Sequence, residues 1–117
     1  MKILFIINEA PYGSEKTYNA LRMANEYGRN HPEVEVRIFL MADAVSCALK
    51  GQDTPNGYYN IERMLKLALT KNAKISLCTT CANARGVDES MLIEGVTMGS
   101  INQIGNWVIE CDRVLVF

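Results

Sequence analysis

Hydrophobic and polar positions follow patterns that predict strands alternating with helices. Residues 3–7 form a continuous apolar run, which is typical of a strand covered on both faces. Residues 34–40 alternate apolar and charged side chains before the run becomes fully apolar, and residues 73–77 alternate again, so both segments are predicted strands. A short irregular strand is expected within residues 91–99, and a terminal strand over residues 113–117.

Helices are predicted between these strands. The first follows Ser14, a suitable N-cap, and ends before Pro32. Asp43 precedes a short helix that Gly51 would end, and residues 52–58 read as an exposed loop. From Ile61 onward, apolar residues recur at the spacing of an amphipathic helix. We expect three apolar residues to line a last helix: Ile101, Ile104 and Val108.

This alternation predicts the fold class. Strand–helix–strand units pair their strands in parallel and cross over right-handedly, which places helices on both faces of one sheet. The 117 residues are enough for one domain, 1–117, and contain no internal repeat. With 49% hydrophobic and 21% charged residues, the chain has the composition of a well-packed globular protein.

Charge and the N-terminal pattern narrow the class of function. Twelve Lys and Arg stand against thirteen Asp and Glu, so we expect no stable binding of nucleic acid. The first apolar run stops after five residues and lacks a small-residue cleavage site, so we predict neither a signal peptide nor a membrane span. The expected location is the cytoplasm.

Four cysteines then require an explanation, because a cytosol keeps most thiols reduced. A zinc site needs four ligands, and the single CxxC of Cys78 and Cys81 has no second pair and no nearby His. We therefore predict no metal and no cofactor. Cys111 is expected in the core, whereas Cys47 lies on a short helix whose apolar stripe it does not clearly share.

The candidate chemistry lies at the carboxyl ends of the predicted strands, where ligands gather in parallel sheets. Three segments reach this edge: residues 8–14, 42–47 and 78–85. If the chain turns into a helix after Cys78, then Cys81 and Arg85 lie on the same side of it. Helix amides and a fixed cation lower a thiol's pKa and favour the reactive thiolate, so we predict a reactive thiolate at Cys78. Three further residues are expected to shape its pocket: Tyr12, Gly13 and Asp43.

Two other interpretations of these residues remain open. A cysteine at a strand end is often only a small buried apolar residue, which would make the chain a non-enzymatic oligomeric binding module. The CxxC is also compatible with a thiol–disulfide switch at Cys78 and Cys81. The switch predicts a reversible intramolecular disulfide, and the binding module predicts no thiol chemistry.

Four segments, 10–14, 39–45, 77–86 and 111–114, together resemble the DsrE/DsrF-like family, most closely its YchN-like branch. The resemblance implies a three-layer α/β/α sandwich with a five-stranded parallel sheet. It also implies that copies of the chain form a homo-oligomer, either a hexamer or a trimer. Relay subunits of this family pass persulfide sulfur through a cysteine after the third strand, a position that Cys78 matches. It therefore implies an intracellular sulfur carrier of sulfurtransferase type, with sulfur donor and acceptor proteins as partners. The relay subunits lack a counterpart of Cys81.

Overall fold

Strands and helices alternate along the chain as the sequence pattern predicts. The computed structural model describes residues 1–117 in full. The elements in chain order are β1 (Lys2–Ile7), α1 (Lys16–Asn30), β2 (Glu35–Leu40), the 3-10 helix η1 (Ala42–Ala48), α2 (Ile61–Thr70), β3 (Lys74–Cys78), α3 (Thr79–Ala84), the 3-10 helix η2 (Glu89–Met91), β4 (Thr97–Gly99), α4 (Ile101–Glu110) and β5 (Arg113–Val116).

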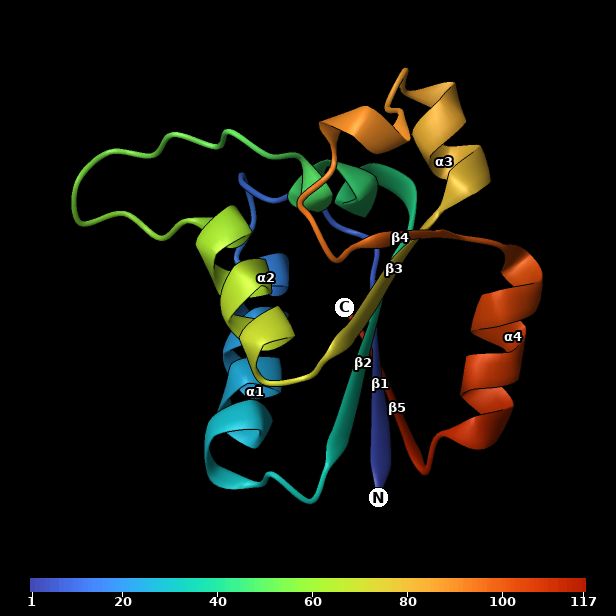
Figure 1. The fold of residues 1–117 in the computed structure, drawn as a ribbon. Helices are drawn as coiled ribbons and strands as arrows, with labels where there is room; N and C mark the ends of the chain where they lie inside the picture. Colours follow the sequence, from blue (N-terminus) through green and yellow to red (C-terminus); the bar gives the residue numbers. More distant parts are fainter.

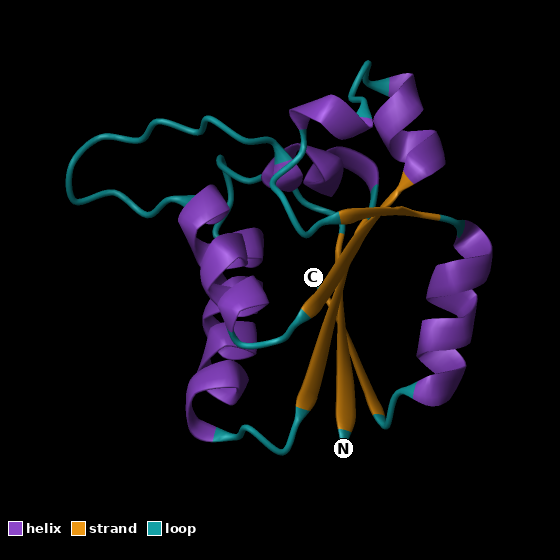
Figure 2. Cartoon of the chain, in the orientation of Figure 1, coloured by secondary structure: helices purple, strands orange, loops and turns teal.

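The five strands form one sheet in the order β4-β3-β2-β1-β5, and every neighbouring pair is parallel. Helices α1 and α2 cover one face of the sheet and α4 covers the other, while η1, η2 and α3 lie beyond the carboxyl ends of the strands (Figures 1 and 2). The expected three-layer fold with a five-stranded parallel sheet is therefore confirmed. None of the helices combines the length and the apolar character that crossing a membrane requires.

The two faces of the sheet carry cores of very different size. A cluster of 24 buried residues fills the space between the sheet and helices α1 and α2. On the α4 side only Leu4, Phe39 and Ile104 are buried together, with Trp107 meeting the Phe39 ring edge-on at 6.0 Å. One ten-residue helix is too small to cover a whole sheet face, so part of this face stays open.

The small core on the α4 side means that the three apolar residues expected to line the last helix are not all buried. Ile104 is buried, but Ile101 is 75% exposed and Val108 is 43% exposed. Three neighbouring apolar residues are exposed as well: Ile109, Val114 and Val116. These five exposed residues are called the α4–β5 apolar patch below. The periodicity located the helix correctly, but no other part of the chain packs over Ile101 and Val108 enough to bury them.

A buried arginine fixes α4 against the sheet. Arg37 of β2 is 4% exposed, and its guanidinium lies 2.6 Å from Glu35 and 2.5 Å from Glu110 at the end of α4. The same group stacks over the Trp107 ring at 5.3 Å from its centroid. Because the guanidinium hydrogen-bonds to it, the pKa of the Glu110 carboxyl is held below its usual value. These contacts position α4, which forms one wall of the site described next.

Candidate functional site

Cys78 is the last residue of β3 and the N-cap of α3. Side chains alternate along a strand, so Leu77 points into the larger core while Cys78 packs against the smaller cluster on the α4 side. The Cys78 sulfur accepts a hydrogen bond from the backbone N–H of Cys81 at 3.3 Å. The predicted turn into a helix after Cys78 is therefore present, and it places both thiols in the first turn of α3.

Cys78 and Cys81 line an open cleft of about 710 Å³. Its walls are the first turn of α3, the end of β4 and the first turn of α4. The lining residues are Cys78, Thr79, Thr80, Cys81, Met98, Gly99, Ser100, Ile101 and Gln103, none of which is charged. The cleft therefore presents two thiols, hydroxyl and amide groups, and apolar side chains.

Hydrogen bonds fix the walls of the cleft. The Thr79 hydroxyl donates to the Gly99 carbonyl at 2.6 Å and joins α3 to β4. The Gln103 side-chain amide donates to the Ser76 hydroxyl at 3.2 Å and joins α4 to β3. Sequence reasoning missed Gln103 and Gly99, because their neighbours depend on the pairing of β4 with β3. Ser100 was detectable, since a serine before an apolar periodic run is a helix N-cap signal, and its hydroxyl does accept from Gln103 N at 3.1 Å.

The surroundings of the two thiols shift their pKa values in opposite directions. Burial raises the pKa of Cys78, and so does its hydrogen bond to Cys81. The pKa of Cys81 is lowered, first by the hydrogen bond from Cys78 and further by the Ala42 amide and the Arg85 guanidinium. Negative charge is therefore more stable on the Cys81 sulfur than on the Cys78 sulfur. The expectation that Arg85 lowers the pKa of Cys78 was wrong, because the guanidinium acts on the other thiol of the pair.

Arg85 and Asp43 hold Cys81 from the side away from the cleft. The Arg85 guanidinium lies 2.9 Å from Asp43 of η1 and also donates to the Cys81 carbonyl at 3.1 Å. Ala42, directly before Asp43, has a φ of 52°, which is strained for a residue with a Cβ. The segments after β2 and β3 thus meet as predicted, and Asp43 contributes through Arg85 without lining the cleft.

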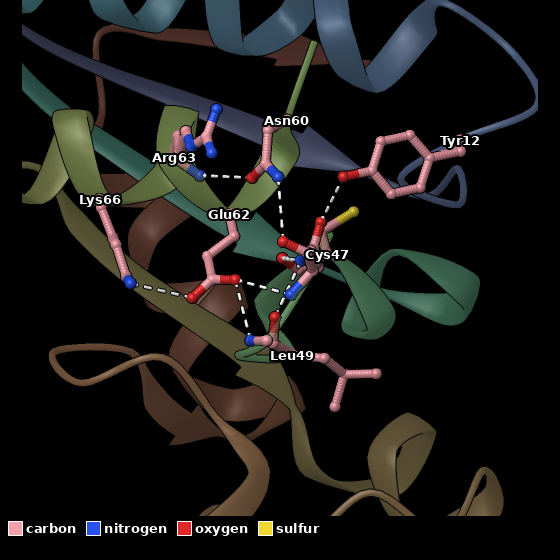
Figure 3. A network of polar contacts seen from close by, with 9 residues as sticks. Tyr12, Cys47, Leu49, Asn60, Glu62, Arg63 and Lys66 are labelled. Carbon is pink, nitrogen blue, oxygen red and sulfur yellow. Dashed lines mark hydrogen bonds and ion pairs between the residues drawn. The ribbon is translucent and has the colours of Figure 1, made fainter. Parts of the chain in front are cut away.

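Tyr12 and Gly13 lie outside the Cys78 cleft. The Tyr12 hydroxyl donates to Gln52 Oε1 at 2.6 Å and accepts from the N–H of Ile61 at 3.1 Å, so it faces the start of α2 (Figure 3). Gly13 has a φ of 106°, which lets the loop turn there. The reason for the separation is the strand order, since β2 lies between β1 and β3.

Around Tyr12, a polar network that sequence reasoning missed anchors both ends of the exposed loop 52–58. Beyond the far end of this loop, the side chain of the buried Asn60 donates to the Gln52 carbonyl at 3.1 Å. The buried Glu62 carboxylate accepts from the amides of Gly51 at 2.9 Å and Gln52 at 2.8 Å, and it pairs with Lys66 at 2.9 Å (Figure 3). Burial alone would raise the pKa of Glu62, but the bonds from Lys66 and the two amides lower it overall. The ends of the loop are therefore fixed to α2 and η1.

The other two cysteines differ from the pair. Cys47 is fully buried and donates to the Glu9 carbonyl at 3.7 Å, so it belongs to the core, although its place in the sequence left this unclear. Burial raises the pKa of Cys47 to about 12, which leaves the thiol unreactive near neutral pH. Cys111 is half-buried beside the smaller cluster, and burial raises its pKa too. No group of three or more His, Cys, Asp or Glu side chains is arranged to hold a metal ion.

Comparison with known proteins agrees with this architecture. A model of the DsrE/DsrF-like family matches residues 1–117. The chain is 40% identical to Protein YchN of Escherichia coli strain K12 over 99% of this chain and 98% of that protein. It is 38% identical to the uncharacterized protein MJ0989 of Methanocaldococcus jannaschii, over 100% of both chains. The crystal structure of E. coli YchN matches with a TM-score of 0.93 over 99% of this chain and 98% of that chain. The chain therefore belongs to the DsrE/DsrF-like family.

Proposed function

We propose that this protein carries sulfur as a persulfide on Cys78. The observation that carries the proposal is the placement of Cys78 at the end of β3, in an open cleft that it shares with a second thiol, Cys81. The DsrE-like family is generally associated with sulfur relay, which supports the same reading. Neither Cys47 nor Cys111 lines this cleft.

Loading begins with proton transfer inside the pair. Cys78 loses its proton as its sulfur attacks the terminal sulfur of a donor persulfide, and the Cys81 sulfur in the same cleft accepts that proton. A new S–S bond forms at Cys78, the S–S bond of the donor breaks, and the donor leaves as a thiolate. Sulfur then leaves when an acceptor thiolate attacks the terminal sulfur and Cys78 departs as a thiolate. No cofactor takes part in either step.

A thiol–disulfide switch is the second candidate, and the placement of both thiols in the first turn of α3, where the Cys81 N–H donates to the Cys78 sulfur at 3.3 Å, favours it. It forms a Cys78–Cys81 disulfide with loss of two electrons and two protons to an external oxidant. The switch needs both cysteines equally, whereas the carrier needs Cys78 to hold the sulfur and uses Cys81 only to speed the loading.

The test is intact-mass measurement after the reduced protein is incubated with a sulfane sulfur donor. We expect a gain of about 32 Da, one sulfur atom, which cyanide and reductant remove. Cys78→Ser should abolish the gain, Cys81→Ser should reach it more slowly, and Cys111→Ser serves as the control that loads normally. A loss of about 2 Da with neither a sulfur gain nor any release of hydrosulfide would establish the switch instead. Unchanged mass under both conditions would leave the binding module as the better description.

We also propose that copies of this chain associate through the α4–β5 apolar patch. Its members Ile109, at 84% exposure, and Val116, at 65%, are large apolar groups of the kind that interfaces cover. Ile101 belongs both to this patch and to the lining of the Cys78 cleft, so a neighbouring subunit would lie beside the reactive thiol. The number of subunits that we expect, six or three, comes from the family resemblance.

Light scattering coupled to size exclusion tests the association. The wild type should run as a homo-oligomer, and Ile109→Glu should shift it towards the monomer. Leu67→Glu is the control, because Leu67 is an exposed apolar residue on α2, outside the patch. A monomeric wild type at micromolar concentration, or dissociation by both variants alike, would contradict this use of the patch.

A further inference from the structure

Cys81 has an environment of its own that sulfur storage on Cys78 does not require. A carrier is most useful when its persulfide persists until the acceptor arrives. Here a second thiol lies in the same helical turn: the backbone N–H of Cys81 donates to the Cys78 sulfur at 3.3 Å, and the Ala42 amide and the Arg85 guanidinium lie near the Cys81 sulfur. Arg85 is itself held by Asp43 at 2.9 Å and bonds the Cys81 carbonyl, so Cys81 is fixed in this position.

We propose that Cys81 discharges the Cys78 persulfide as hydrosulfide when no acceptor is bound. This inference rests on the proposed function, because it starts from the loaded Cys78. It adds a second activity to the same site, namely the reduction of sulfane sulfur to hydrosulfide. The class of substrate is therefore any persulfide that can load Cys78.

The chemistry balances within the pair. Cys81 first releases to solvent the proton that it accepted during loading. Its thiolate then attacks the inner sulfur, Cys78 Sγ, and forms the Cys78–Cys81 disulfide. The bond between Cys78 Sγ and the outer sulfur breaks, and the outer sulfur leaves with the electron pair and its proton as HS⁻. The two cysteines are oxidised by two electrons and the sulfane sulfur is reduced by two. A dithiol reductant of the thioredoxin class must then reduce the disulfide to the starting thiols.

The arrangement of the residues suits this step. Attack on a disulfide-type bond requires a thiolate and a leaving group that is stable as an anion, and the lowered pKa of Cys81 supplies the first of these. Cys78 and Cys81 flank only two residues of the first turn of α3, and the cleft of about 710 Å³ leaves room for the outer sulfur and for its departure. Cys47, fully buried and with its pKa raised to about 12, does not compete as the attacking thiol.

The same geometry makes transfer and discharge competing outcomes. An acceptor thiolate attacks the outer sulfur and leaves the pair reduced, whereas Cys81 attacks the inner sulfur and leaves it oxidised. Occupation of the cleft by an acceptor therefore favours transfer, and an empty cleft favours release of hydrosulfide. Cys81 would thus limit how long an undelivered persulfide survives.

A single-turnover chase tests the proposal. Wild type, Cys81→Ser and the control Cys111→Ser are loaded to completion with a sulfane sulfur donor, freed of donor by gel filtration, and kept without reductant. Hydrosulfide and intact mass are then followed together. We expect wild type and Cys111→Ser to release one hydrosulfide per loaded chain and to end about 2 Da below the reduced mass. Cys81→Ser should retain its sulfur, with release at least about tenfold slower, as expected when the attacking thiolate is removed.

The outcomes separate this inference from the proposal on which it rests. If all three proteins load and then release hydrosulfide at the same rate, the discharge role of Cys81 is overturned while the carrier role of Cys78 stands. The same conclusion follows if wild type keeps its sulfur as long as Cys81→Ser does. If none of the proteins gains sulfur, the carrier role fails and discharge fails with it.

Discussion

Gly99 forms part of the wall of the Cys78 cleft, and replacing it by alanine tests how tightly that wall is packed. A Cβ atom at Gly99 would lie 2.3 Å from Gln103 Oε1, 3.0 Å from Phe39 Cε2 and 3.2 Å from the Leu77 carbonyl oxygen. The Gln103 side chain can swing away, but the Phe39 ring is buried and the Leu77 oxygen belongs to the backbone of β3. Gly99→Ala therefore displaces groups that cannot all move freely.

The expected size of the effect follows from these contacts. Moving Gln103 breaks its hydrogen bond to Ser76, which contributes about 1 kcal/mol. Crowding against Phe39 and Leu77 destabilises by about 1–3 kcal/mol, as extra volume in a packed site does. Alanine restricts the unfolded chain more than glycine, which offsets about 0.5–1 kcal/mol. We expect a net loss of about 2 kcal/mol in the free energy of unfolding.

Gly105→Ala is the matched control, because it makes the same chemical change on α4 where nothing lies within 4 Å of the new Cβ. There alanine should stabilise the helix by about 0.5–1 kcal/mol. Urea unfolding at one protein concentration measures both variants, with the m-value unchanged. If Gly99→Ala is as stable as the wild type, the close packing of Gly99 against Phe39 and Leu77, and with it the shape of the cleft wall, is wrong.

Three further results are expected around the thiols. Folding raises the pKa of Cys47 from 9.0 to about 12, so between these pH values the native state keeps a proton that the unfolded state has released. The free energy of unfolding therefore falls as the pH rises from 9.0 to about 12. The fall attributable to this group is about 1.4 kcal/mol per pH unit, and urea unfolding should show it missing in Cys47→Ala. Arg85→Gln removes the cation near Cys81, so thiolate ultraviolet absorbance should appear at higher pH than in wild type. The control Arg63→Gln, on α2, should titrate like wild type, and equal titration of all three would refute the role of Arg85. Ala42→Gly relieves a left-handed backbone and should stabilise the protein by about 0.5 kcal/mol, whereas a loss of stability in urea would contradict the strain.

Local features of the fold could be predicted from the sequence because they depend on neighbours along the chain. The apolar run of β1, the periodicity of α2 and the turn into α3 after Cys78 each depend on residues that lie only a few positions apart in the sequence. The strand order is different, since it depends on pairings between distant segments. Tyr12 was assigned to the Cys78 pocket on the ground that both follow strands, but β2 separates the two loops.

The electrostatics of the site show the same limit at a finer scale. Spacing placed Cys78, Cys81 and Arg85 on one side of a helix. In the structure the two cysteines line one cleft, whereas Arg85 lies outside that cleft and bonds the Cys81 carbonyl. Spacing did not indicate which thiol the guanidinium stabilises, because that depends on Asp43 drawing Arg85 towards η1. The exposure of Ile101 was equally unpredictable, since apolar periodicity marks a buried face without saying whether the partner belongs to the same chain.

The most direct test of the account is to locate the added sulfur in the wild-type protein. The protein is exposed briefly to a sulfane sulfur donor, quenched with an alkylating reagent, digested and mapped by tandem mass spectrometry. The account predicts an alkylated persulfide on Cys78 within the peptide that also contains Cys81, with Cys47 and Cys111 free of added sulfur. Sulfur found first on Cys81, or on none of the four cysteines, would contradict the claim that Cys78 carries it.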